Sequence, residues 1–306
     1  MSNNLVELLR KKAVCKLFQT SFKNSWSVWK NFIVDQYLDT LTPDSILNLG
    51  DNLKDIFKTT SISGRSQSTL SAGGTNWESL VCYYLNLCLI GRRTVVIKNN
   101  KQLVPSPIAD AISVNYKTFK SNTESDLIAL TFPEKEEYSK DISLLDDIPM
   151  KKNEPDLFNI FDYLCKRDFD DIEIHIIQCK TNWNDNAQIP MLWDMVYASK
   201  GFINEVTVGQ NNYDIDDKVQ NKKFSYSFVT VPTVNECKIK SNSTCVQRVK
   251  NLSGGNYWGL PSKSGVAFSV KEMLKRNLSK GSSLPIRTTL CKEITFLSTE
   301  YSYFRI

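Results

Sequence analysis

Polar side chains that could bind a metal ion stand at the end of one apolar segment. The run Ile176-Ile177-Gln178-Cys179-Lys180 is typical of a buried β-strand. Side chains alternate along a strand, so Gln178 and Lys180 share one face while His175 and Cys179 share the other. An amide oxygen beside an ammonium group at a strand end can bind a metal ion and orient a water molecule.

Two acidic residues could add carboxylates to this strand end. Asp126 opens the apolar segment Asp-Leu-Ile-Ala-Leu, which predicts a second strand, and a carboxylate there makes a hard-oxygen site suited to Mg²⁺. Glu78 stands at the front of an apolar helix that we expect to open at Thr75. The spacing Thr75-x-x-Glu78 is that of a capping box, which alone would account for the glutamate. A direct or water-mediated metal role is the other interpretation, and the two roles can coexist.

Other acids compete with Asp126 for the same role. Asp110 precedes a weaker strand pattern, and three further acids lie where the Gln-x-Lys strand begins, at its exposed entry. We take Asp126 because the apolar strand that follows it is the strongest. The three acids at the entry are Asp170, Asp171 and Glu173.

The arrangement resembles the PD-(D/E)XK nuclease superfamily, and within it the prokaryotic type II restriction endonucleases. The family pattern is a helix that carries Glu, a strand that opens with Asp, and a strand that ends in (Asp/Glu)-x-Lys. Glu78, Asp126 and Lys180 match it, and Gln178 stands where the usual acid would be, as in the Q-x-K variant of Mrr-type nucleases. The resemblance covers roughly residues 75–200.

The chain departs from the family pattern at two places. Ser125 stands where a proline usually precedes the Asp, and an inserted loop at about residues 133–170 lengthens the interval from Asp126 to Gln178. The missing carboxylate at position 178 makes the expected metal site less negative.

The resemblance implies hydrolysis of phosphodiesters in DNA with Mg²⁺, leaving 5′-phosphate and 3′-hydroxyl ends. Asp126, the Gln178 side chain and the Cys179 backbone carbonyl would hold the ion. Lys180 would orient or help deprotonate the attacking water and offset phosphate charge. Glu78 would hold a second ion or a metal-bound water.

The order of predicted elements favours an α/β (α+β) fold: a restriction-endonuclease-like core with a mixed sheet flanked by helices. We expect a helical N-terminal region at 1–60, a catalytic core at 75–200, and a basic C-terminal part at 218–306. Helices are predicted within 4–60 and at Thr75–Ile90, Ala187–Ser199 and Val270–Leu278, with a loop at Thr59–Gly74. Strands are predicted at Arg93–Lys98, Asp126–Phe132, Ile172–Lys180, Phe224–Val231 and Gly265–Val270.

Charge is distributed unevenly along the chain. The net charge is +7 over residues 1–121, −13 over 122–217 and +11 over 218–306, where there is no aspartate. The basic third is a candidate surface for DNA phosphates, although a solvated face that balances the acidic middle is the alternative. Asparagine and glutamine after the catalytic strand could read adenine edges or simply cap a helix. The candidate DNA-binding residues are Asn182, Asn184, Asn186, Gln188, Lys222, Lys223, Lys238, Lys240, Arg248, Lys250, Asn256, Tyr257 and Lys263.

Several function classes are excluded by what the sequence lacks. No P-loop, no G-x-G-x-x-G and no C-x-x-C motif occurs, and the single histidine, His175, is flanked by isoleucines and expected in the core. We expect a cytoplasmic prokaryotic protein without a membrane span, with reduced thiols. By analogy it would act as a homodimer beside a cognate DNA methyltransferase. The alternatives are a structure-specific or repair nuclease, such as a junction resolvase, and a non-catalytic DNA-binding protein.

Overall fold

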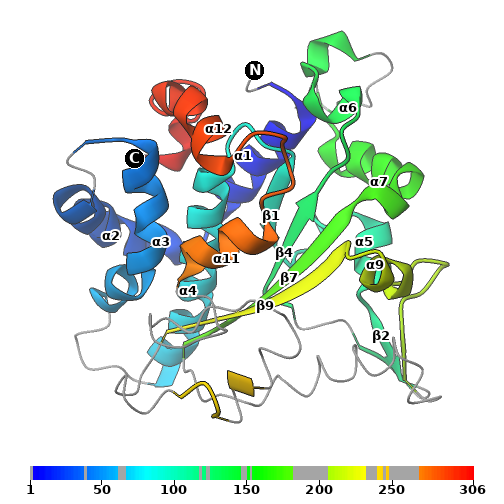
Figure 1. The fold of residues 1–306 in the computed structure, drawn as a ribbon, viewed down its shortest axis with the longest axis horizontal. Helices are drawn as coiled ribbons and strands as arrows, with labels where there is room; N and C mark the ends of the chain where they lie inside the picture. Colours follow the sequence, from blue (N-terminus) through cyan, green and yellow to red (C-terminus); the bar gives the residue numbers. More distant parts are fainter. Residues whose placement is uncertain are drawn as a thin grey trace.

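The computed structural model shows a mixed α/β protein in which helices cover both faces of a central sheet (Figure 1). The described residues are 3–37, 40–60, 67–116, 119–121, 125–145, 150–151, 154–181, 206–231, 240–243, 246–247 and 269–306. No described helix is both long enough and apolar enough to cross a membrane.

Four strands form the main sheet in the described part of the chain. In order across the sheet they are β1 (Thr94–Lys98), β4 (Leu127–Thr131), β7 (Glu173–Lys180) and β9 (Phe224–Thr230). β4 is antiparallel to both of its neighbours, and β7 runs parallel to β9. The central strands carry apolar side chains at consecutive positions, so both faces of the sheet must be covered. Smaller sheets contain β2 (Val114–Tyr116), β3 (Phe119–Ser121) and β8 (Val206–Val208), and β5 (Met150–Lys151) with β6 (Glu154–Pro155).

Two hydrophobic clusters lie on opposite faces of the sheet. The first is formed with α2 (Phe22–Tyr37), α3 (Pro43–Lys58), α4 (Gln67–Cys88), α11 (Val270–Asn277) and α12 (Ile286–Glu293). The second is formed with α5 (Ser106–Ala111), α6 (Glu136–Ser139) and α7 (Leu157–Arg167), and α9 (Asp216–Gln220) lies beside it. Helix α1 (Leu5–Leu17) contributes to both clusters and packs along β1. Short 3₁₀ helices occupy Ile142–Leu144, Phe169–Asp171, Ile294–Phe296 and Ser302–Phe304.

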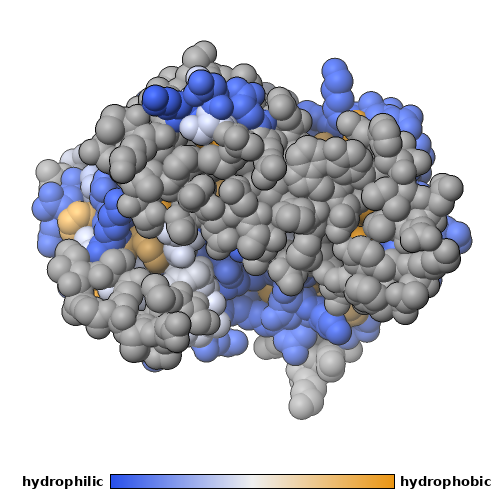
Figure 2. Space-filling view, turned by 90° about the horizontal axis from the view of Figure 1, so that it is seen from below, coloured by the Kyte–Doolittle hydropathy of each residue, from blue (hydrophilic) through white to orange (hydrophobic). Residues whose placement is uncertain are grey.

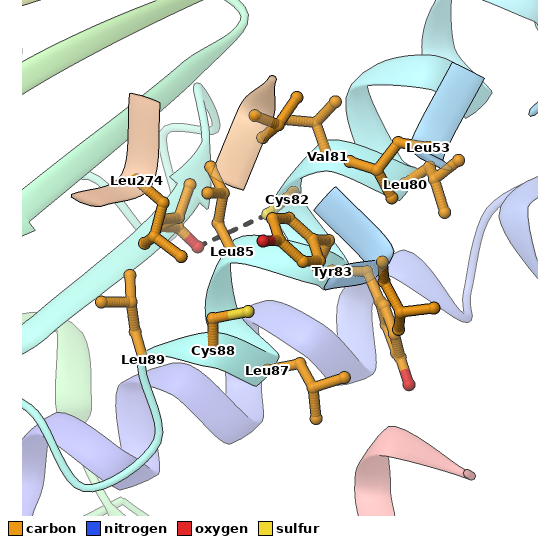
Figure 3. Packing of buried hydrophobic residues seen from close by; sticks show 14 of the residues in the cluster. Leu53, Leu80, Val81, Cys82, Tyr83, Leu85, Leu87, Cys88, Leu89 and Leu274 are labelled. Atoms are coloured by element: carbon orange, nitrogen blue, oxygen red, sulfur yellow. Dashed lines mark hydrogen bonds between the residues drawn. The ribbon is translucent and has the colours of Figure 1, made fainter. Parts of the chain in front are cut away.

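Helix α4 is the central element of the first cluster. Every residue from Leu80 to Ile90 is buried, because the helix contacts the sheet on one side and α2 and α3 on the other. A helix that is apolar all round is stable only when it is surrounded in this way. Figure 3 shows its side chains packed against Leu53 of α3 and Leu274 of α11. The Cys82 thiol donates to the carbonyl of Val96 in β1 at 3.5 Å, which fixes α4 against the sheet.

The strands of the main sheet and the N-terminal helices agree with the sequence-based expectations, but the expected loop at 133–170 is wrong where it contains α6 and α7. Helices α5, α9 and α12 and the strands of the smaller sheets were not predicted. The three N-terminal helices and the strands at β1, β4, β7 and β9 are confirmed, and Thr42 caps α3 with its side chain as its pattern predicts. The six described cysteines are free thiols. The predicted helix Ala187–Ser199 lies outside the described residues. Of the predicted strand Gly265–Val270, only the last two residues are described, and Val270 is the first residue of helix α11.

The predicted loop at Thr59–Gly74 is wrong over its second half. Helix α4 begins at Gln67, within the stretch rich in serine, threonine and glycine. Glycine lowers helix stability by about 1 kcal/mol per residue, but Gly73 and Gly74 directly precede the apolar face that the sheet buries. Packing of that face therefore outweighs the weak local propensity.

A buried ion pair connects α1 to the sheet and to α4. Arg10 is fully buried, and its Nε donates to Glu7 at 2.9 Å. The guanidinium also donates to Asn86 Oδ1 at 3.3 Å and to the Arg92 carbonyl at 2.8 Å. The other oxygen of Glu7 accepts from the Gly91 amide at 2.9 Å, where the chain turns with φ of 72°. The pair therefore has partners on both sides, which is the condition under which a buried ion pair is tolerated.

Replacing Arg10 with methionine should destabilise the protein by about 3–5 kcal/mol, because Glu7 would remain buried without its cation. Urea-induced unfolding followed by circular dichroism measures the change in the free energy of unfolding. The control is Lys11→Met, an exposed neighbour on the same helix, which should stay within about 0.5 kcal/mol of the unmodified protein. A loss below about 1 kcal/mol for Arg10→Met would contradict this account of the network.

Candidate active site

Strand pairing brings three distant segments to one end of the main sheet. Lys98, the last residue of β1, lies opposite Leu127 of β4, and Leu127 lies opposite Ile177 of β7. Asp126 directly precedes Leu127, and its carbonyl accepts from the Asn99 amide at 3.1 Å. The end of β1, the start of β4 and the end of β7 therefore meet, as can be followed in Figure 1.

Helix α4 reaches the same sheet end with its N-terminal half. The Trp77 indole donates to the carbonyl of Val229 in β9 at 3.3 Å, and Trp77 is fully buried. The next residue, Glu78, forms an ion pair with Lys98 at 2.8 Å between Oε2 and Nζ. The apolar anchor on one residue thus fixes where the carboxylate on the next residue lies.

The capping-box interpretation of Glu78 is wrong. Because α4 begins at Gln67, Thr75 and Glu78 both lie inside the helix and neither caps its start. The glutamate is bound to Lys98, not to a helix N-terminus. Its presence therefore needs an explanation at the sheet end.

Asp126 is held by the strand that carries the Gln-x-Lys motif. Its Oδ2 accepts from Gln178 Nε2 and from the Cys179 backbone amide, each at 2.7 Å. Both bonds go to the same oxygen, and no hydrogen bond joins Oδ1 to the described residues. The N–H and C=O of one strand residue point to the same side, so the Cys179 carbonyl also faces the side of Asp126.

The electrostatic environment of Asp126 is unfavourable for its charged form. Burial, and after it the nearby charge of Glu78, raise the pKa of Asp126 to about 7. The Cys179 amide, Lys180 and Lys98 act in the opposite direction and do not cancel the effect. Two carboxylates and two ammonium groups therefore lie within electrostatic reach of one another.

The site residues expected from the sequence come together, and one residue that sequence reasoning missed joins them. Asp126 accepts hydrogen bonds from Gln178 and Cys179. Glu78 pairs with Lys98, and Lys180 acts on Asp126 electrostatically. Lys98 was missed. Its signal was present in the sequence, since it ends a predicted apolar strand in the same way as Lys180 does.

The competing acids have other partners. Asp110 accepts from the side chains of Gln210 and Asn211. Asp171 pairs with Lys135 and Lys223, and Glu173 pairs with Lys280. None of these is beside Gln178. His175 is buried, its Nδ1 hydrogen-bonds to Ser225, and burial lowers the pKa of its imidazole to about 3.

The described candidates for DNA binding are not part of this cluster. Lys222 and Lys223 precede β9, which places them beside the start of β7, whereas Lys180 ends that strand. At about 3.3 Å per residue, the separation along the sheet is roughly 20 Å. Lys240 is exposed. The remaining candidates lie outside the described residues: Asn182, Asn184, Asn186, Gln188, Lys238, Arg248, Lys250, Asn256, Tyr257 and Lys263.

The donor set is suited to Mg²⁺ but not to a closed metal cage. Among the described residues, no group of three or more His, Cys, Asp or Glu side chains could hold a metal. Mg²⁺ is usually bound through one or two carboxylates and keeps several waters, and Asp126 Oδ1 with the Cys179 carbonyl offers such an open set. The Gln178 amide donates to Asp126, but turning the amide by 180° would present Oε1 beside the carboxylate. A cation would also offset the burial and the nearby Glu78 charge, which raise the pKa of Asp126.

Figure 2 looks at the molecule from below. Hydrophilic residues, in blue, make up most of the described surface that is visible in this view.

Replacing Asp126 with asparagine should stabilise the metal-free protein at pH 8. The folded-state pKa of about 7 exceeds the unfolded value of about 3.9, so ionising Asp126 costs folding free energy as pH rises between these values. The three-unit difference corresponds to at most about 4 kcal/mol, and solvent screening reduces the expected gain to about 1–2 kcal/mol. Asparagine keeps an oxygen for the two hydrogen bonds.

Urea unfolding at several pH values measures this difference. The gain should be present at pH 8, shrink as pH falls below about 7, and vanish below about pH 3, where both states of the unmodified protein are protonated. Asp110→Asn serves as the matched control, with no such pH-dependent gain. A destabilising effect of Asp126→Asn at pH 8 would show that the charged form is favoured in the fold.

Comparison with known proteins gives no assignment. The chain matches no protein-family model, no curated protein and no solved structure. The chemistry of the site therefore has to be inferred from the geometry of Asp126 and its neighbours.

Proposed function

We propose that this protein is a Mg²⁺-dependent deoxyribonuclease that cuts double-stranded DNA at a specific sequence, in the manner of type II restriction endonucleases. The observation that carries the proposal is the contact of the Gln-x-Lys strand with Asp126. Gln178 and Cys179 both donate to the one carboxylate that the family pattern selects, 52 and 53 residues earlier in the chain. The register of β4 with β7 places the Gln-x-Lys motif beside that residue, as the family pattern requires.

The arrangement around the motif supports a restriction-endonuclease-like core. The helix with Glu78, the strand opened by Asp126 and the strand ended by Lys180 follow one another in the chain as the family pattern requires. Helix α4 packs on both β1 and β7, and β4 lies between these two strands. The inserted segment between β4 and β7 includes α7, which packs on the opposite face of the sheet, so the insertion does not separate the site residues.

Phosphodiester hydrolysis needs an activated water and stabilisation of charge on the phosphate. Mg²⁺, when bound, supplies Lewis acidity and lowers the pKa of its water ligand. Asp126 Oδ1, the Gln178 amide oxygen and the Cys179 carbonyl are the groups that would hold it. Lys180 ends the strand beside them, where its ammonium orients the attacking water and offsets negative charge on the phosphate. Recognition of a palindromic site by a homodimer, and a partner methyltransferase, belong to the same proposal.

Glutamine at position 178 fits the charge of this site. The Gln178 amide donates to Asp126, a carboxylate that already lies near Glu78. An acid at position 178 would replace that donor with a third negative charge. The amide keeps an oxygen for the metal without adding to the repulsion.

Digestion of a long DNA in the presence of Mg²⁺ tests the proposal. We expect discrete fragments with 5′-phosphate ends from the unmodified protein. Asp126→Asn and Lys180→Met should reduce the cleavage rate by at least about 10²-fold, because the first weakens metal binding and the second removes the charge beside the phosphate. Gel-shift affinity in Ca²⁺ should change by less than tenfold in either variant.

The matched control is Lys292→Met, which removes an exposed lysine of α12 and should cut like the unmodified protein. Cleavage of branched DNA alone would instead indicate a structure-specific nuclease. A gel shift without any cutting would indicate a DNA-binding protein, and full activity of Lys180→Met would exclude that residue from the site.

Changing Gln178 to glutamate should destabilise the metal-free protein by about 1–3 kcal/mol at pH 8, because a donor to Asp126 becomes a like charge. Saturating Mg²⁺ should reverse most of this loss, since the added carboxylate is then a metal ligand. Thermal unfolding with Mg²⁺ or with EDTA measures both effects. Gln102→Glu, an exposed glutamine, should show no response of this kind to Mg²⁺.

A further inference from the structure

Lys98 is held on helix α4 by three acceptors. Its Nζ pairs with Glu78 Oε2 at 2.8 Å and lies 3.4 Å from Ser79 Oγ and 3.5 Å from the Thr75 carbonyl. An ammonium group has three hydrogens to donate, and α4 supplies three acceptors for them. The side chains of Lys98 and Glu78 are 24% and 21% exposed, so the pair is mostly shielded from water. Lys98 is therefore held against α4, with Glu78 as its closest partner.

The position of this ammonium is the one that a second metal ion would need. Glu78 is the carboxylate that would hold such an ion, and Lys98 already pairs with it. Lys98 lies opposite Leu127 in the register of β1 with β4, and Asp126 directly precedes Leu127, so the pair lies close to the first metal position.

Counting charges favours one divalent ion over two. Glu78 and Asp126 contribute two negative charges, and Lys98 and Lys180 contribute two positive charges. One Mg²⁺ brings the cluster to +2, and a second would bring it to +4, against a single negative charge on a phosphodiester. Because these groups lie at least partly away from water, such an excess would be poorly screened.

We propose that Lys98 takes the place of a second divalent cation at Glu78, which confines the site to a single ion on the Asp126 side. This inference depends on the proposed nuclease function. Lys98 is then a positioning residue: it holds Glu78 and supplies one fixed positive charge. Glu78 contributes its charge through Lys98 and not as a direct metal ligand.

The number of metal ions bound by the DNA-free protein tests this inference without any measurement of activity. Mn²⁺ is the probe, and electron paramagnetic resonance reports both the bound ions per chain and any magnetic coupling between them. The unmodified protein should bind one uncoupled Mn²⁺. Lys98→Met should bind two, because Glu78 then becomes available, and Glu78→Gln added to Lys98→Met should return the number to one.

Two matched variants separate the charge of Lys98 from its packing. Lys98→Arg keeps a cation beside Glu78 and should bind one Mn²⁺. Lys101→Met removes an exposed lysine three residues away and should also bind one. Circular dichroism verifies that each variant is folded.

The possible outcomes distinguish this inference from the proposed function. Two Mn²⁺ ions in the unmodified protein would overturn the inference even if Lys98→Met does not fold. One ion in both the unmodified protein and Lys98→Met, with equal affinity, would also overturn it and leave the nuclease proposal intact. No Mn²⁺ binding by the unmodified protein, together with no Mg²⁺-dependent cleavage, would overturn both.

Discussion

Burial of helix α4 against the main sheet is the constraint on which the candidate site depends. The helix is apolar on all sides, so it is stable only between the sheet and the outer helices. Trp77 anchors its N-terminal half to β9, and Cys82 anchors its middle to β1. With these contacts made, Glu78 has to lie at the sheet end where Asp126 and the Gln-x-Lys strand meet. Hydrophobic packing thus determines where a carboxylate stands, although the carboxylate itself contributes nothing to that packing.

The resulting cluster is an example of local electrostatic strain in a well-packed protein. Asp126 lies in a partly buried position near a second carboxylate, and the pKa of its side chain is raised for that reason. Natural proteins keep such unfavourable groups where function requires them. The glutamine at position 178 and the lysine at position 98 both reduce the repulsion, the first by donating a hydrogen bond and the second by pairing with Glu78.

The sequence alone was sufficient for the four strands of the main sheet, but not for the short strands of the smaller sheets. Alternating and continuous apolar patterns identify β1, β4, β7 and β9, because strands covered on both faces leave a strong signal. The start of α4 was not predictable in this way, since its first turns have poor helix propensity and are stabilised by tertiary contacts. The capping-box interpretation of Glu78 failed for the same reason. The role of Lys98 depends on strand register and on the rotation of α4, and neither is encoded in a short motif.

The contacts of residues 279–304 affect when the protein can become functional during its synthesis. Tyr83 of α4 donates to the Phe304 carbonyl at 2.9 Å, and Phe304 itself is buried against the first cluster. Arg92, just before β1, donates to the carbonyls of Leu284 and Ser279. The helix that carries Glu78 and the strand that carries Lys98 are thus stabilised by contacts with residues more than 180 positions later in the chain. A growing chain on the ribosome lacks this support until residues 279–304 have been made, so a centre built on these elements would mature only after that point.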